Sequence, residues 1–131
     1  MLSVSPIYIS LLTLLIIFLA YRVTTFRRSE KISLGENNGS KAMKSAIRAH
    51  ANAVENIPIA AVLLLMLEIN AVNSILLHLF GLILLLSRYA HAWGLSKKNG
   101  ATPGRFYGTL FTWLCVVVML VVNLIVVFIR A

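Results

Sequence analysis

The sequence predicts an all-α integral membrane protein, in which four transmembrane helices form one bundle and both termini lie on the non-cytoplasmic side. Hydrophobic residues make up 60% of the 131 residues and charged residues only 12%, about half the charged share of typical soluble domains. The mean hydropathy is +0.89. Small domains leave much of their surface exposed, so a chain this apolar cannot hide its hydrophobic side chains by folding alone. It therefore requires lipid around it.

Four apolar segments are the expected spans, at about residues 2–22, 44–69, 74–93 and 105–129 of a single domain, residues 1–131. The first carries no charge as far as Tyr21 and reaches the length of about 20 residues that a spanning helix needs. It has no basic region before it and no small-residue cleavage site, so we expect a retained helix, not a signal peptide. The polar segment from Arg22 to Lys44 is expected to be a loop.

A second helix is expected to begin near Lys41 and to run to about Asn70. Its apolar part, residues 57–67, has only 11 residues, too few to cross a bilayer. The polar stretch IRAHANAVENIP before it must therefore enter the membrane. Pro58 is acceptable there, because membrane helices tolerate proline better than soluble ones do.

The short turn EINAVNS leads to the third helix, and the polar loop GLSKKNGATPG leads to the fourth, with Pro103 and Gly104 at its start. Cys115 lies in an apolar run and has no partner for an internal disulfide. We interpret it as a small buried hydrophobic residue. Asn123, also in this run, is expected to bond between helices.

The basic residues predict the orientation. Most flank two of the three connections: Arg22, Arg27, Arg28, Lys31, Lys41, Lys44 and Arg48 at the first, and Arg88, Lys97, Lys98 and Arg105 at the other. The opposite side has only Glu68 and Arg130. By the positive-inside rule both basic loops are cytoplasmic. The formal charge of +8 would suit nucleic acid, but the basic residues cluster between the apolar segments and form no stripe on a soluble surface. This distribution argues against nucleic acid as a partner and favours contact with anionic lipid.

On a helix, one face of the second segment is polar. Its residues recur at spacings of three and four: Lys41, Lys44, Arg48, Asn52 and Glu55. Glu55 lies about 10 Å deeper than Arg48 at the rise of a helix. Ionisable residues at membrane depth are candidates for function. The alternative is a packing network, in which Asn52 bonds between helices and Arg48 neutralises Glu55.

Other helix ends bring further cations and aromatic rings to the same level of the membrane: Arg22 to Arg28, the stretch RYAHAW and Arg105 to Tyr107. This pattern suits an anionic or zwitterionic small ligand, with arginines on its carboxylates and Glu55 on an ammonium group. The apolar helix faces would admit a lipophilic second substrate. No metal is expected, because His50, His78 and His91 lack ligand spacing. His91 is expected at the interface, and His78 is expected to pair with Glu68.

The stretch RAHANAVENIP resembles the helix-two signature of the MAPEG family, the membrane-associated proteins in eicosanoid and glutathione metabolism. The signature is approximately R-A-x-x-N-x-x-E. The resemblance extends to the four spans, the long polar first loop, an Arg-Tyr pair closing the third helix and an arginine opening the fourth. Among members, the chain resembles the compact bacterial branch, which implies a multi-pass protein of the bacterial inner membrane.

The resemblance implies a homotrimer that binds glutathione between adjacent subunits near the cytoplasmic face. Matching positions assign Arg48, Asn52 and Glu55 to glutathione binding, with Arg88 and Tyr89 from the third helix. His50 would contact either the peptide or lipid headgroups. Asn56 and Trp93 stand where some members have tyrosines, so the hydrogen bonding there must differ.

The resemblance also implies a role for Arg105, which would stabilise the glutathione thiolate. Tyr89 or Tyr107 would donate a hydrogen bond to the sulfur, although Tyr107 is more typical of an interfacial anchor. The leading hypothesis is therefore a microsomal-type glutathione transferase, or a glutathione-dependent peroxidase, acting on lipophilic electrophiles. The alternatives are a noncatalytic scaffold that binds glutathione or lipid, and a small transporter that uses Glu55.

Overall fold

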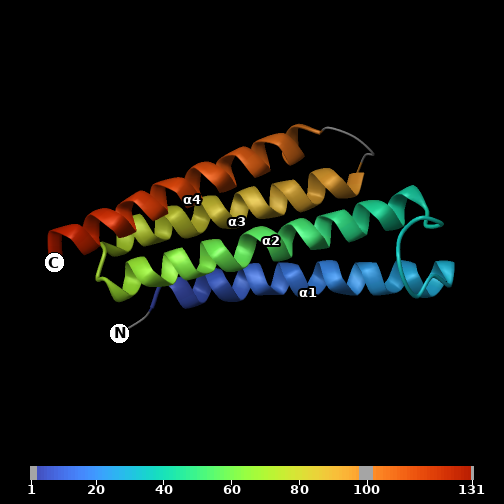
Figure 1. Ribbon diagram of the computed structural model, residues 1–131, viewed down its shortest axis with the longest axis horizontal. Coiled ribbons are helices and arrows are strands. Elements are labelled where there is room, and N and C mark those ends of the chain that lie inside the picture. Colours follow the sequence, from blue (N-terminus) through green and yellow to red (C-terminus); the bar gives the residue numbers. More distant parts are fainter. Residues whose placement is uncertain (1–2, 98–101, 131) are drawn as a thin grey trace.

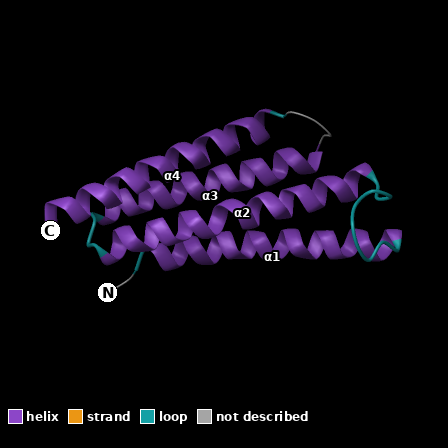
Figure 2. Ribbon diagram, viewed as in Figure 1, coloured by secondary structure: helices purple, strands orange, loops and turns teal. Residues whose placement is uncertain are grey.

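The computed structural model describes residues 3–97 and 102–130, and every element in these two ranges is a helix (Figure 2). The helices are α1 (Ser5–Glu30), α2 (Lys41–Ile69), α3 (Ser74–Lys97) and α4 (Pro103–Arg130). All four are long and apolar enough to cross a membrane. They run alternately up and down, so both chain ends lie at one end of the bundle (Figure 1). The predicted four-helix membrane bundle is confirmed.

The helices extend beyond the predicted spans at the end that carries the basic loops. The segment after residue 22, expected as a loop, is helical as far as Glu30. The helix ends at Lys31, which has a left-handed backbone (φ 57°) and donates its N–H to the carbonyls of Arg27 and Arg28. Polar residues outside the membrane do not stop a helix, whereas such a cap does. Lys98, in the second basic loop, lies outside the described residues.

The first connection is held closed by Glu30. Its carboxylate accepts a hydrogen bond from the backbone N–H of Ser40 at 2.7 Å, and another from the Ser40 hydroxyl. That hydroxyl in turn accepts from the backbone N–H of Met43, at 3.1 Å, as the N-cap of α2. The end of α1 therefore fixes the start of α2.

Small residues line the inner face of α2 and leucines fill the centre of the bundle. Ala46, Ala49, Ala53 and Ala60 are all buried, at the spacing of one helix face. The largest fully buried side chains are mostly leucine: Leu12, Leu19, Leu64, Leu67 and Leu84, with Met43 and Met119. Apolar side chains such as Leu114 and Phe128 remain exposed on the outside, as a lipid-facing surface requires.

The helices α3 and α4 approach closely at their basic-loop end. A Cβ added at Gly108 would lie 2.6 Å from the carbonyl oxygen of Ser87, and one at Gly104 would lie 2.9 Å from that of Ala90. Such distances exclude any larger residue without movement of the backbone. The two glycines therefore let the first turns of α4 rest on α3, as small residues do between membrane helices.

At the other end of the bundle, Glu68 caps α1. Its carboxylate accepts hydrogen bonds from the backbone N–H groups of Ser3, Val4 and Ser5 at 2.6–2.7 Å, and also from the Ser5 hydroxyl. The expected pairing of Glu68 with His78 is wrong, because the free N–H groups at a helix start are stronger competitors for a carboxylate. His78 instead bonds through Nδ1 to the hydroxyl of Tyr8, at 3.1 Å.

Two further expectations about apolar segments are confirmed. Asn123 donates through Nδ2 to the carbonyl of Leu63, at 3.2 Å, and so joins α4 to α2. Cys115 is buried and lies 3.7 Å from the carbonyl oxygen of Phe80.

Candidate functional site

A hydrogen bond between α2 and α3 lies at the centre of the polar region. Arg88 donates from Nη1 to Oδ1 of Asn52, at 2.8 Å. The arginine is only 3% exposed, although its guanidinium has five donors to satisfy. Its Nε and Nη2 are buried and have no partner among the described residues. A buried cation with unused donors is costly unless an acceptor meets it, so this position favours an anionic or carbonyl-bearing ligand.

The polar face of α2 points outward from the single chain. The inner face of the helix consists of small and apolar residues, and on the opposite face Arg48 and Glu55 are exposed, with Asn52 half-buried between them. Within the described part of the chain, Arg48 and Glu55 form no hydrogen bond or ion pair. The packing alternative is therefore confirmed in one part, since Asn52 bonds between α2 and α3, but the described residues do not show Arg48 neutralising Glu55. Both charged groups are available to a ligand.

Asn56 and Trp113 join this polar face to α4. Asn56 donates through Nδ2 to the carbonyl of Asn52, at 2.9 Å, and accepts through Oδ1 from Nε1 of Trp113, at 3.2 Å. The indole of Trp113 also borders a hollow of about 320 Å³ on α4, together with Thr102, Arg105, Phe106, Thr109 and Leu110. We call the side that holds this hollow and the polar face of α2 the α2–α4 side. It carries Arg48, Asn52, Glu55 and Arg105.

The start of α4 is held by His91, which lies on α3. His91 is 4% exposed. Its Nδ1 lies 3.1 Å from the carbonyl oxygen of Arg105 and 3.0 Å from the hydroxyl of Thr109. The expectation of an interfacial histidine is therefore wrong. His91 lies three residues after Arg88, so both side chains share one face of α3, and that face is buried. This spacing is the feature of the sequence that could have indicated a buried histidine.

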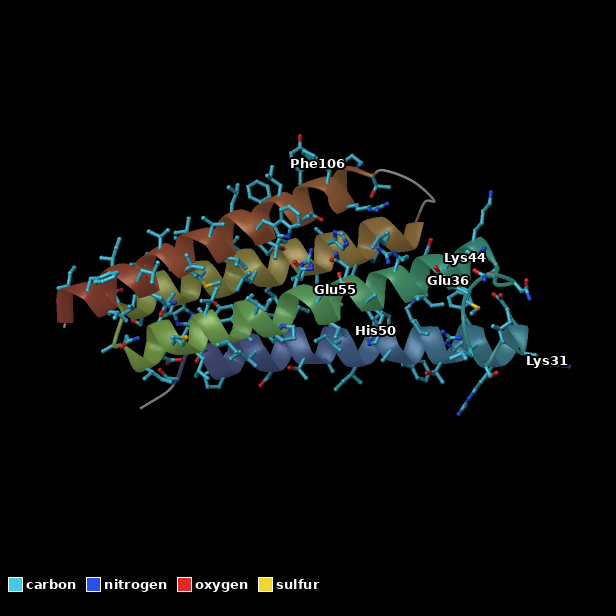
Figure 3. All side chains as sticks on the ribbon, viewed as in Figure 1. Lys31, Glu36, Lys44, His50, Glu55 and Phe106 are labelled. Atoms are coloured by element: carbon cyan, nitrogen blue, oxygen red, sulfur yellow. The ribbon has the colours of Figure 1, made fainter. Side chains whose placement is uncertain are left out.

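Other residues assigned by resemblance lie near α1. The hydroxyl of Tyr89 donates to the carbonyl of Leu11 in α1, at 3.4 Å. Tyr89 and Trp93 both border a cavity of about 360 Å³ between α1 and α3, with Arg22 at one side. His50 stands about 200° around α2 from Arg48, and Figure 3 shows it beside α1, whereas Glu55 lies on the side of α2 nearer α3.

A single chain thus does not bring all the predicted residues together. The α2–α4 side holds Arg48, Asn52, Glu55 and Arg105, with Arg88 behind them. The α1 side, as we call the surface around α1, holds His50, Tyr89 and Trp93.

Tyr107 does not line the hollow on the α2–α4 side. Tyr107 is 54% exposed and stacks on Phe111 with ring centroids 6.3 Å apart, on the far flank of α4 from Arg105. This position fits an interfacial aromatic anchor. Among the described residues, no group of three or more His, Cys, Asp or Glu side chains has the arrangement of a metal site.

Comparison with known proteins agrees with this architecture. The model of the MAPEG family matches residues 5–125. The chain is 35% identical over 121 residues to the inner membrane protein YecN of Escherichia coli K12, which covers 92% of this chain and 90% of YecN. The YecN of E. coli O6:H1 matches to the same extent. With four apolar helices and an inner-membrane relative, the chain is a multi-pass inner-membrane protein.

Proposed function

Because the chain belongs to the MAPEG family, whose members include glutathione transferases and related proteins, we propose that it is a membrane glutathione transferase or glutathione-dependent peroxidase. Its substrates would be lipophilic electrophiles that reach it through the bilayer. One observation carries this proposal: the α2–α4 side presents Arg48, Glu55 and Arg105, whose charged groups form no hydrogen bond or ion pair with any described residue, beside the bonded pair of Asn52 and Arg88.

Glutathione has the charges that this side would complement. It carries two carboxylates, one ammonium group and a thiol. Arg48 would bind a carboxylate, since a guanidinium suits carboxylates in particular, and Glu55 would bind the ammonium group. Arg88 holds the amide of Asn52 in one orientation, so the remaining Asn52 groups would bind the peptide of glutathione at a reduced cost in ordering.

Arg105 would activate the thiol. A free thiol has a pKa of about 8.5, and a neighbouring guanidinium favours the thiolate, which is the reactive form. The sulfur then forms a bond to the electrophilic carbon, whose leaving group departs with the bonding electron pair. No nucleophile from the protein is required. The apolar walls of the hollow, Phe106, Leu110 and Trp113, would admit the lipophilic substrate beside the sulfur.

A homotrimer would complete the site. His50, Tyr89 and Trp93 cannot meet the α2–α4 side of their own chain, but a neighbouring copy that presents its α1 side can bring them there. Such a contact joins two different surfaces, and repeated contacts of this kind close into a ring when the rotation allows it. A site shared between subunits is therefore consistent with the positions of these three residues.

A noncatalytic scaffold that binds glutathione or lipid is the second candidate. In this chain an asparagine, Asn56, stands where some family members have a tyrosine. Its side-chain amide forms hydrogen bonds with Asn52 and Trp113. Trp93, at another such position, is 65% exposed. Both departures remove hydroxyl groups that would otherwise assist the sulfur.

The deciding experiment uses the purified protein in detergent. Calorimetry measures glutathione binding, ultraviolet absorbance measures the bound thiolate, and turnover is followed with a generic aryl halide. We expect Arg105→Ala to bind glutathione within about threefold of wild type but to lose most of the thiolate and turnover, about 100-fold, as when one charge-stabilising group is removed.

Each outcome selects one function. Glutathione binding without turnover across a wide panel of electrophiles would favour the scaffold. If millimolar glutathione does not bind, neither function holds. Tyr107→Phe serves as the control, because Tyr107 lies away from the hollow that contains Arg105.

A further inference from the structure

His91 is a buried histidine of α3 that contacts the backbone of α4 at Arg105, the residue proposed above to stabilise the thiolate. Its Nδ1 is 3.1 Å from the carbonyl oxygen of Arg105. The hydroxyl of Thr109 lies 3.0 Å from the same Nδ1 and donates to the same carbonyl, also at 3.0 Å. The three groups therefore form a closed cluster between α3 and the first turns of α4.

The contact between Nδ1 and the Arg105 carbonyl is a hydrogen bond only in the tautomer whose Nδ1 carries the proton. A carbonyl oxygen can only accept, so Nδ1 must donate to Arg105. The other ring nitrogen, Nε2, is buried and has no partner among the described residues. Thus Nδ1 is the ring atom that acts on α4.

Close packing of the α3 and α4 backbones around His91 restricts movement between the two helices. A Cβ added at Gly108 would lie 2.8 Å from both the Cβ and the backbone nitrogen of His91. The helices therefore touch directly, one turn after Arg105. Ser87 and Thr112 bond across the same contact through their hydroxyls, at 2.9 Å. With α4 held at these points, the carbonyl of Arg105 cannot move without breaking the cluster.

We propose that His91 is a positioning residue that sets the place of Arg105 through the backbone carbonyl, and so places its guanidinium at the ligand sulfur. The proposal rests on the proposed function, in which Arg105 stabilises the thiolate. Arg105 is itself exposed, with the freedom of a long side chain. Holding its backbone reduces the range of positions that its guanidinium can reach, and a misplacement of about 1 Å at a reacting group can lower the rate about 100-fold.

Three variants of His91 separate the roles of its two nitrogens. His91→Asn places an amide N–H near the position of Nδ1, and His91→Gln places one near Nε2. His91→Leu has neither. We expect the leucine and glutamine variants to show 10- to 100-fold lower kcat and a smaller fraction of bound thiolate at fixed pH. Their dissociation constants for glutathione should stay within about threefold of wild type, because the residues proposed to bind its charged groups are intact.

The asparagine variant should recover most of the thiolate and of kcat. His78→Asn is the matched control: His78 also lies on α3 and bonds to another helix, but at the opposite end of the bundle, and it should not change the thiolate. Thermal unfolding of each variant in detergent shows whether a loss merely reflects damage to the fold.

The outcomes distinguish the two proposals. If wild type forms the thiolate and Arg105→Ala abolishes it, but His91→Leu behaves as wild type, the role of His91 is wrong and the proposed function stands. If all three His91 variants lose binding, thiolate and thermal stability together, His91 is only structural and the inference also fails. If wild type binds no glutathione, the proposed function fails and the role of His91 fails with it.

Discussion

At the scale of single residues, the pair of Asn52 and Arg88 is a packing contact between α2 and α3 that we also propose as part of the glutathione site. Arg88 is buried where an apolar side chain would give a more stable fold. The reason is that the desolvation penalty of a buried charge often exceeds the free energy gained from its interactions. Among the described residues, the hydrogen-bond partner of Arg88 is the side-chain oxygen Oδ1 of Asn52, at 2.8 Å. The desolvation penalty of the Arg88 guanidinium would be offset by a ligand that accepts hydrogen bonds from its Nε and Nη2.

The bond between Asn52 and Arg88 should contribute to stability. Asn52→Ala leaves the buried guanidinium without its acceptor, and should lower the free energy of unfolding by about 1.5–3 kcal/mol, the value of a hydrogen bond to a charged group. Arg88→Met removes the charge and should restore much of that loss in the double variant, because the two residues act as a unit. Denaturant titration in mixed micelles measures all four proteins.

We expect Arg88→Met to affect glutathione binding and stability in opposite directions. Arg88→Met should be as stable as wild type or more so, yet bind glutathione at least about tenfold more weakly. An Arg88→Met variant that binds normally would show that Arg88 is a packing residue alone.

At the scale of the helices, each end of the bundle is closed by one carboxylate. Glu30 holds the start of α2 through Ser40, and Glu68 holds the start of α1 through three backbone N–H groups. Free N–H groups at a helix start must find acceptors, and in lipid they cannot find them in water. The cap on α1 comes from a distant part of the chain, so it also ties α1 to α2.

We predict that Glu68→Ala destabilises the bundle and leaves the site intact. The loss of one such cap costs about 1–2 kcal/mol, measured by denaturation in micelles, while the dissociation constant of glutathione should not change. Glu68→Gln keeps an acceptor oxygen and should lose less. His78→Asn is the control, since His78 bonds to Tyr8 and not to Glu68. A fall in glutathione affinity for Glu68→Ala would mean that the two ends of the bundle are coupled.

At the scale of the whole molecule, the separation of the α2–α4 side from the α1 side is the main result for function. If a neighbour supplies His50, then Arg48→Ala and His50→Ala damage the same site from different subunits. We expect each variant alone to bind glutathione poorly.

Mixed assemblies of the two variants should recover part of the binding, because a site that takes Arg48 from one subunit and His50 from the other contains both native residues. Co-expression with two different affinity tags isolates these assemblies for calorimetry. Mixtures that bind no better than either parent would place the whole site within a single subunit. Oligomer mass in detergent, measured on the same samples, supplies the number of subunits.

Much of the fold and part of the site follow from local pattern. The four spans were predictable because hydropathy over about 20 residues decides whether a segment crosses a bilayer. The polar face of α2 was predictable because residues three and four apart share a helix face. The extension of α1 to Glu30 was not, since polar residues outside lipid permit helix and loop alike. The pairing of Glu68 was also mistaken, because several donors competed for one carboxylate.

The sequence by itself therefore determined that this protein has four segments that cross the membrane, and that arginine, asparagine and glutamate share one face of α2. Composition and periodicity along the chain suffice for such properties. The placement of the basic loops on the cytoplasmic side stays a prediction of the positive-inside rule. Only the tertiary structure decided that Arg88 meets Asn52, that His91 holds the carbonyl of Arg105 and that Tyr89 faces α1. These contacts depend on how each helix is rotated against its neighbours, which is set by close packing between residues far apart in the chain.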